Sequence, residues 1–238
     1  MTGYAPGLLR HWKSVTVLVL ALLVWTFYTP AVKAFLGLFF SKSERLVYDR
    51  SPLWSFLLEH VMLVAIAGVA AVIIGGLGGL LVMSPLGRPF RGVILRLANL
   101  GQAVPSVAIM AIAVPAVGYG SEPVLLALVI YSVLPVMVNV VAGISAVPGA
   151  VVEAGKGMGM TRRDRLLQIE LPLAMPVIMT GVRTMLVILI SAATLGAVVG
   201  AGGLGVPIMS GIGALNNSVV IHGAVPAILL ALIADRAL

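Results

Sequence analysis

Residues 61–83 read VMLVAIAGVAAVIIGGLGGLLVM, an apolar stretch without a charged side chain. A helix that crosses a bilayer needs about 20 mostly apolar residues, because hydrocarbon offers no partner to free backbone groups. The stretch is long enough for one crossing. It therefore predicts a transmembrane helix, in which Gly75 and Gly79 are spaced for a close helix contact within the chain or across a dimer.

The composition of the whole chain agrees with this stretch. Of 238 residues, 61% are hydrophobic and 10% are charged, against about 45–50% and 25% in soluble domains. Six stretches are apolar and long enough to cross a membrane: 15–38, 61–83, 97–117, 123–144, 175–199 and 218–234. The predicted fold class is an all-α integral membrane protein with about six transmembrane helices. The chain has no cysteine, and we assign no catalytic residue and no metal site.

Basic residues gather on one side of these spans. If both termini and the loops at 84–96 and 146–172 share a side, that side holds ten of the 15 Lys and Arg residues: Arg10, Lys13, Arg88, Arg91, Arg96, Lys156, Arg162, Arg163, Arg165 and Arg236. By the positive-inside rule both termini are cytoplasmic. This placement accounts for the net charge of +7 without a nucleic acid partner. Alternatively, the first stretch is a cleaved secretory signal, although its apolar run is long for one.

The loop at 146–172 has a layout that its residues predict. Residues 148–158 favour a short helix, which Gly157 and Gly159 end because glycine adopts the left-handed conformation at low cost. Thr161 and Asp164 have the spacing of a capping box for a second helix. In that helix, we expect Leu166, Leu167 and Ile169 to face protein. The result is a helical knuckle that projects from the membrane, either a solvated connector or a docking surface.

The knuckle resembles the EAA loop of ABC-importer permease subunits. Glu153-Ala154-Gly155, then Gly159, then Ile169-x-Leu171-Pro172 match that loop, and Gly155 stands where many members have alanine. The resemblance implies the type I importer permease fold and a coupling helix that docks into a separate ATPase subunit. The residues that it assigns to ATPase coupling are Glu153, Ala154, Gly155, Lys156, Gly157, Met158, Gly159, Met160, Thr161, Ile169, Leu171 and Pro172.

Four further stretches resemble permeases for osmoprotectants: Gln102-Ala103-Val104-Pro105-Ser106, Tyr131-Ser132-Val133-Leu134-Pro135, Gly200-Ala201-Gly202-Gly203-Leu204-Gly205 and Gly223-Ala224-Val225-Pro226. The similarity leaves 1–57, with an extra transmembrane helix, before a permease core at 58–238. It implies glycine betaine, choline, carnitine or proline betaine as solutes, and an inner-membrane location. It also implies three partners: a second permease subunit, an extracytoplasmic substrate-binding protein, and ATPase subunits that hold ATP and Mg in place of this chain.

Two glycine-rich stretches match nucleotide motifs superficially. Gly200–Gly205 has the spacing Gly-x-Gly-x-x-Gly, but it follows a membrane span instead of a strand. Lys156 ends a loop like a phosphate-binding loop, but Gly157 follows it where Ser or Thr is required. We therefore expect no nucleotide site on this chain. The glycines at 200–205 are expected to form tight turns, and the uncharged segment 200–218 is expected to pack against protein.

Polar residues inside the spans leave alternatives open. Asn99, Gln102, Asn139 and Thr194, with Pro105 and Tyr131, could line a pathway or pack helices together. Packing is favoured, because polar side chains in spans usually bond across helices. Two rival functions also stay open: an importer for another solute, such as an amino acid or sulfonate, and a secondary carrier. Such carriers depend on ionisable groups inside spans, and Arg183 is the clearest candidate here.

Overall fold

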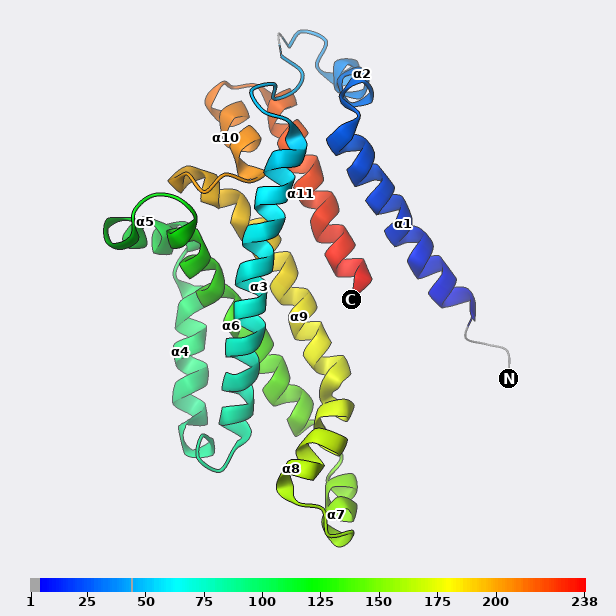
Figure 1. Ribbon diagram of the computed structural model, residues 1–238, viewed down its shortest axis with the longest axis vertical. Helices are drawn as coiled ribbons and strands as arrows, with labels where there is room; N and C mark the ends of the chain where they lie inside the picture. Colours follow the sequence, from blue (N-terminus) through cyan, green and yellow to red (C-terminus); the bar gives the residue numbers. More distant parts are fainter. Residues whose placement is uncertain (1–4, 44) are drawn as a thin grey trace. The chain divides into compact units, whose positions relative to one another are not determined.

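The computed structural model describes residues 5–43 and 45–238, and the regular elements in these residues are helices. Within this part of the chain, four helices are long and apolar enough to cross a membrane: α3 (Leu53–Met83), α6 (Ser121–Ser145), the continuous helix Arg162–Val199 and α11 (Asn217–Ala237). A fifth crossing is possible where α1 (Ala5–Phe27) meets α2 (Thr29–Phe39) at a bend of 92°. The all-α membrane class is confirmed (Figure 1).

The predicted span at 97–117 is wrong as an unbroken helix. α4 (Arg91–Ala103) ends and α5 (Ser106–Val117) begins on either side of Val104 and Pro105. Val104 is extended, with φ −87° and ψ 128°, because the ring of a proline disfavours the helical conformation in the residue before it. The mean hydropathy of the stretch 97–117 does not reveal such a break, because the residues on both sides of it are apolar. The prediction at 15–38 missed the bend between α1 and α2 for a similar reason, since Pro30 lies in the first turn of α2.

The chain divides into two compact units. One contains the described residues up to Ala67, with Pro105–Leu128 and Leu186–Leu238, and the other contains Gly68–Val104 and Val129–Met185. In the second unit, glycines bring α6 close to α3 and to α9 (Leu171–Ala193). A Cβ on Gly75 would lie 2.7 Å from the Val133 carbonyl oxygen, and one on Gly181 would lie 2.8 Å from the Pro135 carbonyl oxygen. The predicted close contact at Gly75 and Gly79 is confirmed, and it lies within the chain.

In the other unit, α11 packs against α1 and against α10 (Gly205–Gly213), as Figure 1 shows. One buried cluster joins Leu53, Phe56, Leu204 and Ala227, and another joins Val32, Leu36 and Val47. The expectation that 200–218 packs against protein is confirmed for 203–207 and Gly211, because α10 buries Gly205, Pro207 and Gly211; it is wrong for 212–215, where Leu215 is 92% exposed.

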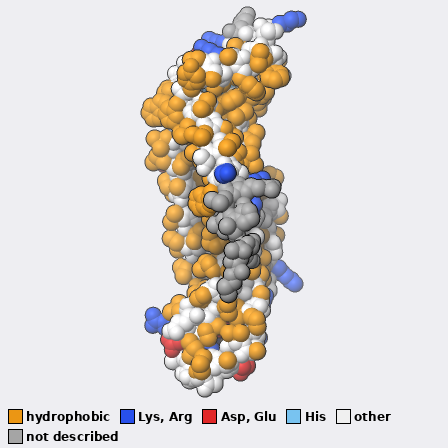
Figure 2. All heavy atoms as spheres, turned by 90° about the vertical axis from the view of Figure 1, so that its right-hand side faces the viewer, with side chains coloured by type: hydrophobic (Ala, Val, Ile, Leu, Met, Phe, Trp, Pro, Cys, Tyr) orange, Lys and Arg blue, Asp and Glu red, His pale blue; other side chains and the backbone are white. Residues whose placement is uncertain are grey.

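Apolar side chains cover much of the exposed surface. Figure 2 shows hydrophobic side chains over most of the visible face, whereas Asp and Glu side chains on that face lie at the end formed by α7 (Gly149–Gly157) and α8 (Arg162–Arg165). Large side chains such as Ile66, Ile73 and Leu77 of α3 are more than half exposed. Soluble monomers rarely expose apolar patches larger than a few hundred Å², so this surface is suited to lipid.

Candidate functional site

The carboxyl end of α7 is closed by hydrogen bonds that favour glycine. The Met160 N–H donates to the Gly155 carbonyl at 3.1 Å, and the Gly159 N–H donates to the Lys156 carbonyl at 2.9 Å. Gly159 itself has a φ of +77°. This is the Schellman arrangement, in which the residue after the helix is left-handed. The predicted helix and its end at Gly159 are confirmed, whereas Gly157 remains helical.

A second helix starts at the predicted capping box. Thr161 Oγ1 accepts a hydrogen bond from the Asp164 N–H at 3.2 Å, and the Thr161 N–H donates to Asp164 Oδ2 at 3.2 Å. α8 continues through a π-helical turn, η2 (Leu166–Glu170), into α9, so that Arg162–Val199 is one continuous helix. The knuckle, residues 146–172, is therefore joined to a span without a flexible linker.

The knuckle has two arms, α7 and the segment formed by α8 and η2. They pack together at Gly155, which is buried in α7. A Cβ at this position would lie 2.9 Å from Ile169 Cδ1 and 3.2 Å from Arg165 Cδ. Arg165 Nη1 also donates to the Met160 carbonyl at 2.9 Å. α7 thus lies directly on η2. Because the two arms are in contact, a displacement of one arm is expected to displace the other.

A further contact ties the knuckle to α3. Arg162 Nη2 donates to the carbonyl of Met83, the last residue of α3, at 3.1 Å, where a cation is favourable because helix carbonyls are left without donors. Leu167 is 51% exposed, so the prediction that it faces protein was wrong. Leu166 and Ile169 are half-buried.

The outer face of α7 is polar and exposed. Lys156 Nζ lies 2.7 Å from Glu153 Oε1, and the two side chains are 49% and 69% exposed. The hydrogen bond and charge of Lys156 lower the pKa of Glu153. The carboxylate is therefore charged at neutral pH, and the pair is lost when the pH falls below that lowered pKa. Exposed ion pairs add little stability, so these charges remain available to a partner.

The remaining predicted coupling residues divide by exposure. Ala154, Met158 and Pro172 are exposed, as are Gly157, Gly159 and Thr161. Met160 and Leu171 are half-buried, like Ile169. The structure therefore brings the predicted set together in one compact hairpin of helices with an outer face and a packed inner face. This arrangement can bind a partner and pass its movement to α9.

The side chains of Gln102 and Tyr131 donate hydrogen bonds to backbone carbonyls, one of which Pro135 leaves without a helical donor. Pro135 has no N–H, so the carbonyl of Tyr131, four residues earlier in α6, lacks its helical donor. Gln102 Nε2 donates to that carbonyl at 2.9 Å. The Tyr131 hydroxyl donates to the Val104 carbonyl at 2.9 Å, just beyond the end of α4. These bonds favour the packing alternative for both side chains.

We expect Gln102→Leu to lower the free energy of unfolding by about 1–2 kcal/mol, because it leaves the Tyr131 carbonyl without a donor. Pro135→Ala restores a backbone N–H to α6, so the same change should cost clearly less in that background. A double-mutant cycle of denaturation in detergent measures this coupling. Additive costs of the two substitutions would contradict the assignment.

A second carbonyl that lacks its helical donor because of a proline occurs in the other unit, where a side chain again supplies the hydrogen bond. The sequence analysis did not predict this arrangement. Pro226 in α11 deprives the His222 carbonyl of its helical donor, and Trp25 Nε1 donates to that carbonyl at 3.1 Å. The Tyr48 N–H donates to His222 Nδ1 at 3.1 Å. A proline inside a predicted span marks the carbonyl that needs a donor. The donor itself depends on tertiary structure.

The glycine-rich turn at 200–205 packs on α3. The Gly203 N–H donates to Glu59 Oε2 at 2.8 Å, and Gly202 and Gly203 have φ values of +79° and +73°. A Cβ on Gly203 would lie 3.2 Å from His60 Nδ1. The prediction that these glycines form tight turns is confirmed.

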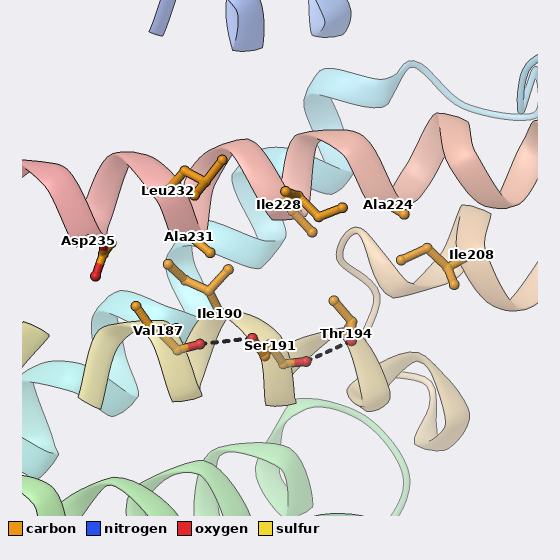
Figure 3. A pocket seen from close by; sticks show the side chains of 11 residues that line it. Val187, Ile190, Ser191, Thr194, Ile208, Ala224, Ile228, Ala231, Leu232 and Asp235 are labelled. Atoms are coloured by element: carbon orange, nitrogen blue, oxygen red, sulfur yellow. Dashed lines mark hydrogen bonds between the residues drawn. The ribbon is translucent and has the colours of Figure 1, made fainter. Parts of the chain in front are cut away.

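Thr194 lines a groove of about 390 Å³ among α9, η3 (Thr194–Val199), α10 and α11. Figure 3 shows its hydroxyl and that of Ser191 turned back onto their own helix: Ser191 Oγ donates to the Val187 carbonyl at 2.9 Å and Thr194 Oγ1 donates to the Ser191 carbonyl at 2.7 Å. Most of the lining is aliphatic, and Asp235 lies at one end.

The other predicted pathway or packing residues do not join this groove. Asn139 Nδ2 donates to the Pro135 carbonyl of its own helix at 2.8 Å. Asn99 is exposed on α4, and Pro105 is exposed at the start of α5.

The long apolar helices define the class as an integral membrane protein. The chain belongs to the family of binding-protein-dependent transport system inner membrane components, whose model matches residues 75–238. As a permease subunit it is a transport protein and not an enzyme.

Several curated relatives carry transport names. The choline transport system permease protein OpuBB of Bacillus subtilis is 40% identical over 181 residues, which cover 76% of this chain and 82% of that protein. The carnitine transport permease protein OpuCD of Listeria monocytogenes is 38% identical over 189 residues, 79% of this chain and 82% of that protein. The osmoprotectant import permease protein OsmY of Salmonella typhimurium is 33% identical over 224 residues, 94% of this chain and 89% of that protein.

The fold is shared with a solved importer. A structure titled as an inward-facing conformation of the MetNI methionine ABC transporter superposes with a TM-score of 0.66 at 21% identity, covering 78% of this chain and 94% of that chain. The predicted type I importer permease fold is thereby confirmed.

Proposed function

We propose that this chain is one of two permease subunits of an ATP-driven importer of osmoprotectants, with glycine betaine, choline or carnitine as solutes. The names of its relatives support this solute class. A second permease subunit, a copy or a paralogue, completes the pathway. A substrate-binding protein delivers the solute from outside, and separate ATPase subunits hold ATP and Mg.

The observation that carries the proposal is the knuckle. Its outer face exposes Glu153 and Met158, and its second arm is one continuous helix with α9. Closure of the ATPase subunits draws the knuckle with it, and the continuous helix carries the movement into the membrane as a rigid body. The solute path then opens outward. In this topology the knuckle and both termini are cytoplasmic.

For the pathway itself, we assign Gln102 and Tyr131 to helix packing, because their hydrogen bonds join α4 and α6. Asn139 is assigned to packing because a Cβ on Gly181 of α9 would lie 2.6 Å from Asn139 Cβ. Thr194 lies in the groove of Figure 3 and is a candidate for the pathway wall. The Thr194 hydroxyl is already bonded to its own helix, so this hydroxyl and the neighbouring methyl group would interact only weakly with a solute. Weak interaction suits a solute that must be released during transport.

The solute class is tested by competition. We expect uptake of labelled glycine betaine by the complete importer to be inhibited by excess choline or carnitine and not by methionine. Inhibition by methionine would favour the amino-acid alternative. Uptake that continues without the ATPase subunit would favour a secondary carrier.

The coupling role is tested by Glu153→Lys. This change places a second cation beside Lys156 on an exposed face, so we expect the chain to insert and fold normally. Uptake should fall at least about tenfold, because about 1.4 kcal/mol of lost complementarity at the docking face corresponds to a factor of ten. Glu122→Lys, another exposed acid at the start of α6, is the matched control. Wild-type uptake with Glu153→Lys would contradict the role.

A further inference from the structure

α2 leaves the direction of α1 at 92°. α1 has 23 residues, or about 34 Å at 1.5 Å per residue. The hydrocarbon core of a bilayer is about 30 Å thick, so α1 matches that thickness in length, although the part of α1 from Trp12 onward reaches the apolar length of a span only together with α2. A helix at right angles to its end then runs along the plane of the membrane.

The side chains of α2 divide into three faces. Val32 and Leu36 are buried against Val47, with Trp25 and Ile221 packed on the same cluster. Phe35, Leu38 and Phe39 are 49%, 79% and 68% exposed. Lys33 is also exposed. At about 100° per residue, Lys33 lies about 140–160° around the helix from Leu38 and Phe35. One exposed face is therefore apolar, and the face opposite to it carries a cation.

The aromatic rings extend this pattern to the end of α1. The ring centroids of Trp25 and Phe35 are 5.8 Å apart, and those of Phe35 and Phe39 are 5.4 Å apart. Aromatic side chains concentrate at the boundary between hydrocarbon and headgroups. A helix in that boundary has an apolar face toward the acyl chains and a basic face toward water, which is the division that α2 shows.

We propose that α2 is an interfacial helix that binds the lipid surface through Phe35, Leu38 and Phe39. The segment after α2 is fixed to the start of α11: Ser218 Oγ donates to the Leu46 carbonyl at 2.7 Å, and Asn216 Nδ2 donates to the Arg45 carbonyl at 2.9 Å. Lipid binding by α2 thereby sets the depth at which α11 begins. This role depends on the membrane-spanning fold and not on coupling to an ATPase.

The absence of cysteine from the sequence allows a direct test. Spin labels are attached to single-cysteine variants of the full chain in nanodiscs of phosphatidylethanolamine and phosphatidylglycerol. Leu38→Cys and Phe35→Cys report on the apolar face, Lys33→Cys on the opposite face, and Leu20→Cys on the exposed side of α1. Accessibility to oxygen, which concentrates in hydrocarbon, is compared with accessibility to a water-soluble nickel complex.

The ratio of oxygen to nickel accessibility is expected to be at least about threefold higher at Leu38 and Phe35 than at Lys33. The ratio at Leu20 should be higher still. Equal ratios on the two faces of α2 would overturn the proposal, because the apolar face would then lie in water. Shielding of the Leu38 label from both reagents would also overturn it, because a protein surface such as a second copy of this chain would then cover α2.

Discussion

Gly75→Val is expected to lower the free energy of unfolding by about 2 kcal/mol or more, whereas Gly76→Val should change it by less than about 0.5 kcal/mol. A Cβ on Gly75 would lie 2.7 Å from the Val133 carbonyl oxygen and 2.9 Å from Val136 Cβ. The backbone of α6 cannot yield as a side chain can, so α3 and α6 must separate. A Cβ on Gly76 would meet nothing within 4 Å.

Thermal unfolding of the two purified variants in detergent measures this difference. The variants carry the same substitution at adjacent positions of one helix, so helix propensity and added hydrophobicity are matched. Equal midpoints for the two variants would show that α3 and α6 do not approach each other at Gly75.

Gly159→Val is expected to reduce uptake at least about tenfold while leaving the amount of inserted chain unchanged. Gly159 has a φ of +77°, and a β-branched residue in that conformation costs about 1–3 kcal/mol. A cost of about 1.4 kcal/mol already lowers the equilibrium constant for forming the native turn tenfold. The loss falls on the turn that joins α7 to the arm continuous with α9, so coupling is expected to fail while the membrane helices remain folded.

Gly149→Val is the matched control for this experiment. A Cβ on either glycine would meet nothing within 4 Å, but Gly149 is the first residue of α7 and has no positive φ. Uptake with Gly149→Val should stay within about twofold of the native value, because a helical valine carries no comparable strain. Equal losses in the two variants would show that bulk, and not the left-handed turn, matters here.

Local chemistry explains which features the sequence predicts well. The capping box at Thr161 and Asp164 and the helix end at Gly159 depend on residues within a few positions of each other, so their geometry follows from spacing alone. The long apolar stretches likewise predict α3, α6, α9 and α11. The local shape of the knuckle therefore follows from its sequence.

Two proline breaks, and the hydrogen-bond partners that tertiary structure supplies, were not predicted. Pro105 and Pro30 could have indicated breaks at 97–117 and 15–38, but hydropathy outweighed them. Pro135 indicates that the Tyr131 carbonyl needs a donor, yet only the packing of α4 on α6 identifies Gln102 as that donor. Leu167 was expected to face protein together with Leu166 and Ile169, but a π-helical turn changes the direction of the side chains along η2.

Cross-linking from the knuckle tests most directly whether it is the surface that a separate ATPase subunit moves. Met158 is 73% exposed on the knuckle, and Leu215 is 92% exposed at the turn before α11, which the proposed topology places across the membrane. In the assembled importer, a cysteine-reactive cross-linker on Met158→Cys is predicted to join the chain to the ATPase subunit, with a yield that changes when ATP is added. Leu215→Cys should give no such product. Absence of the Met158 product from a complex that still imports solute would contradict the account.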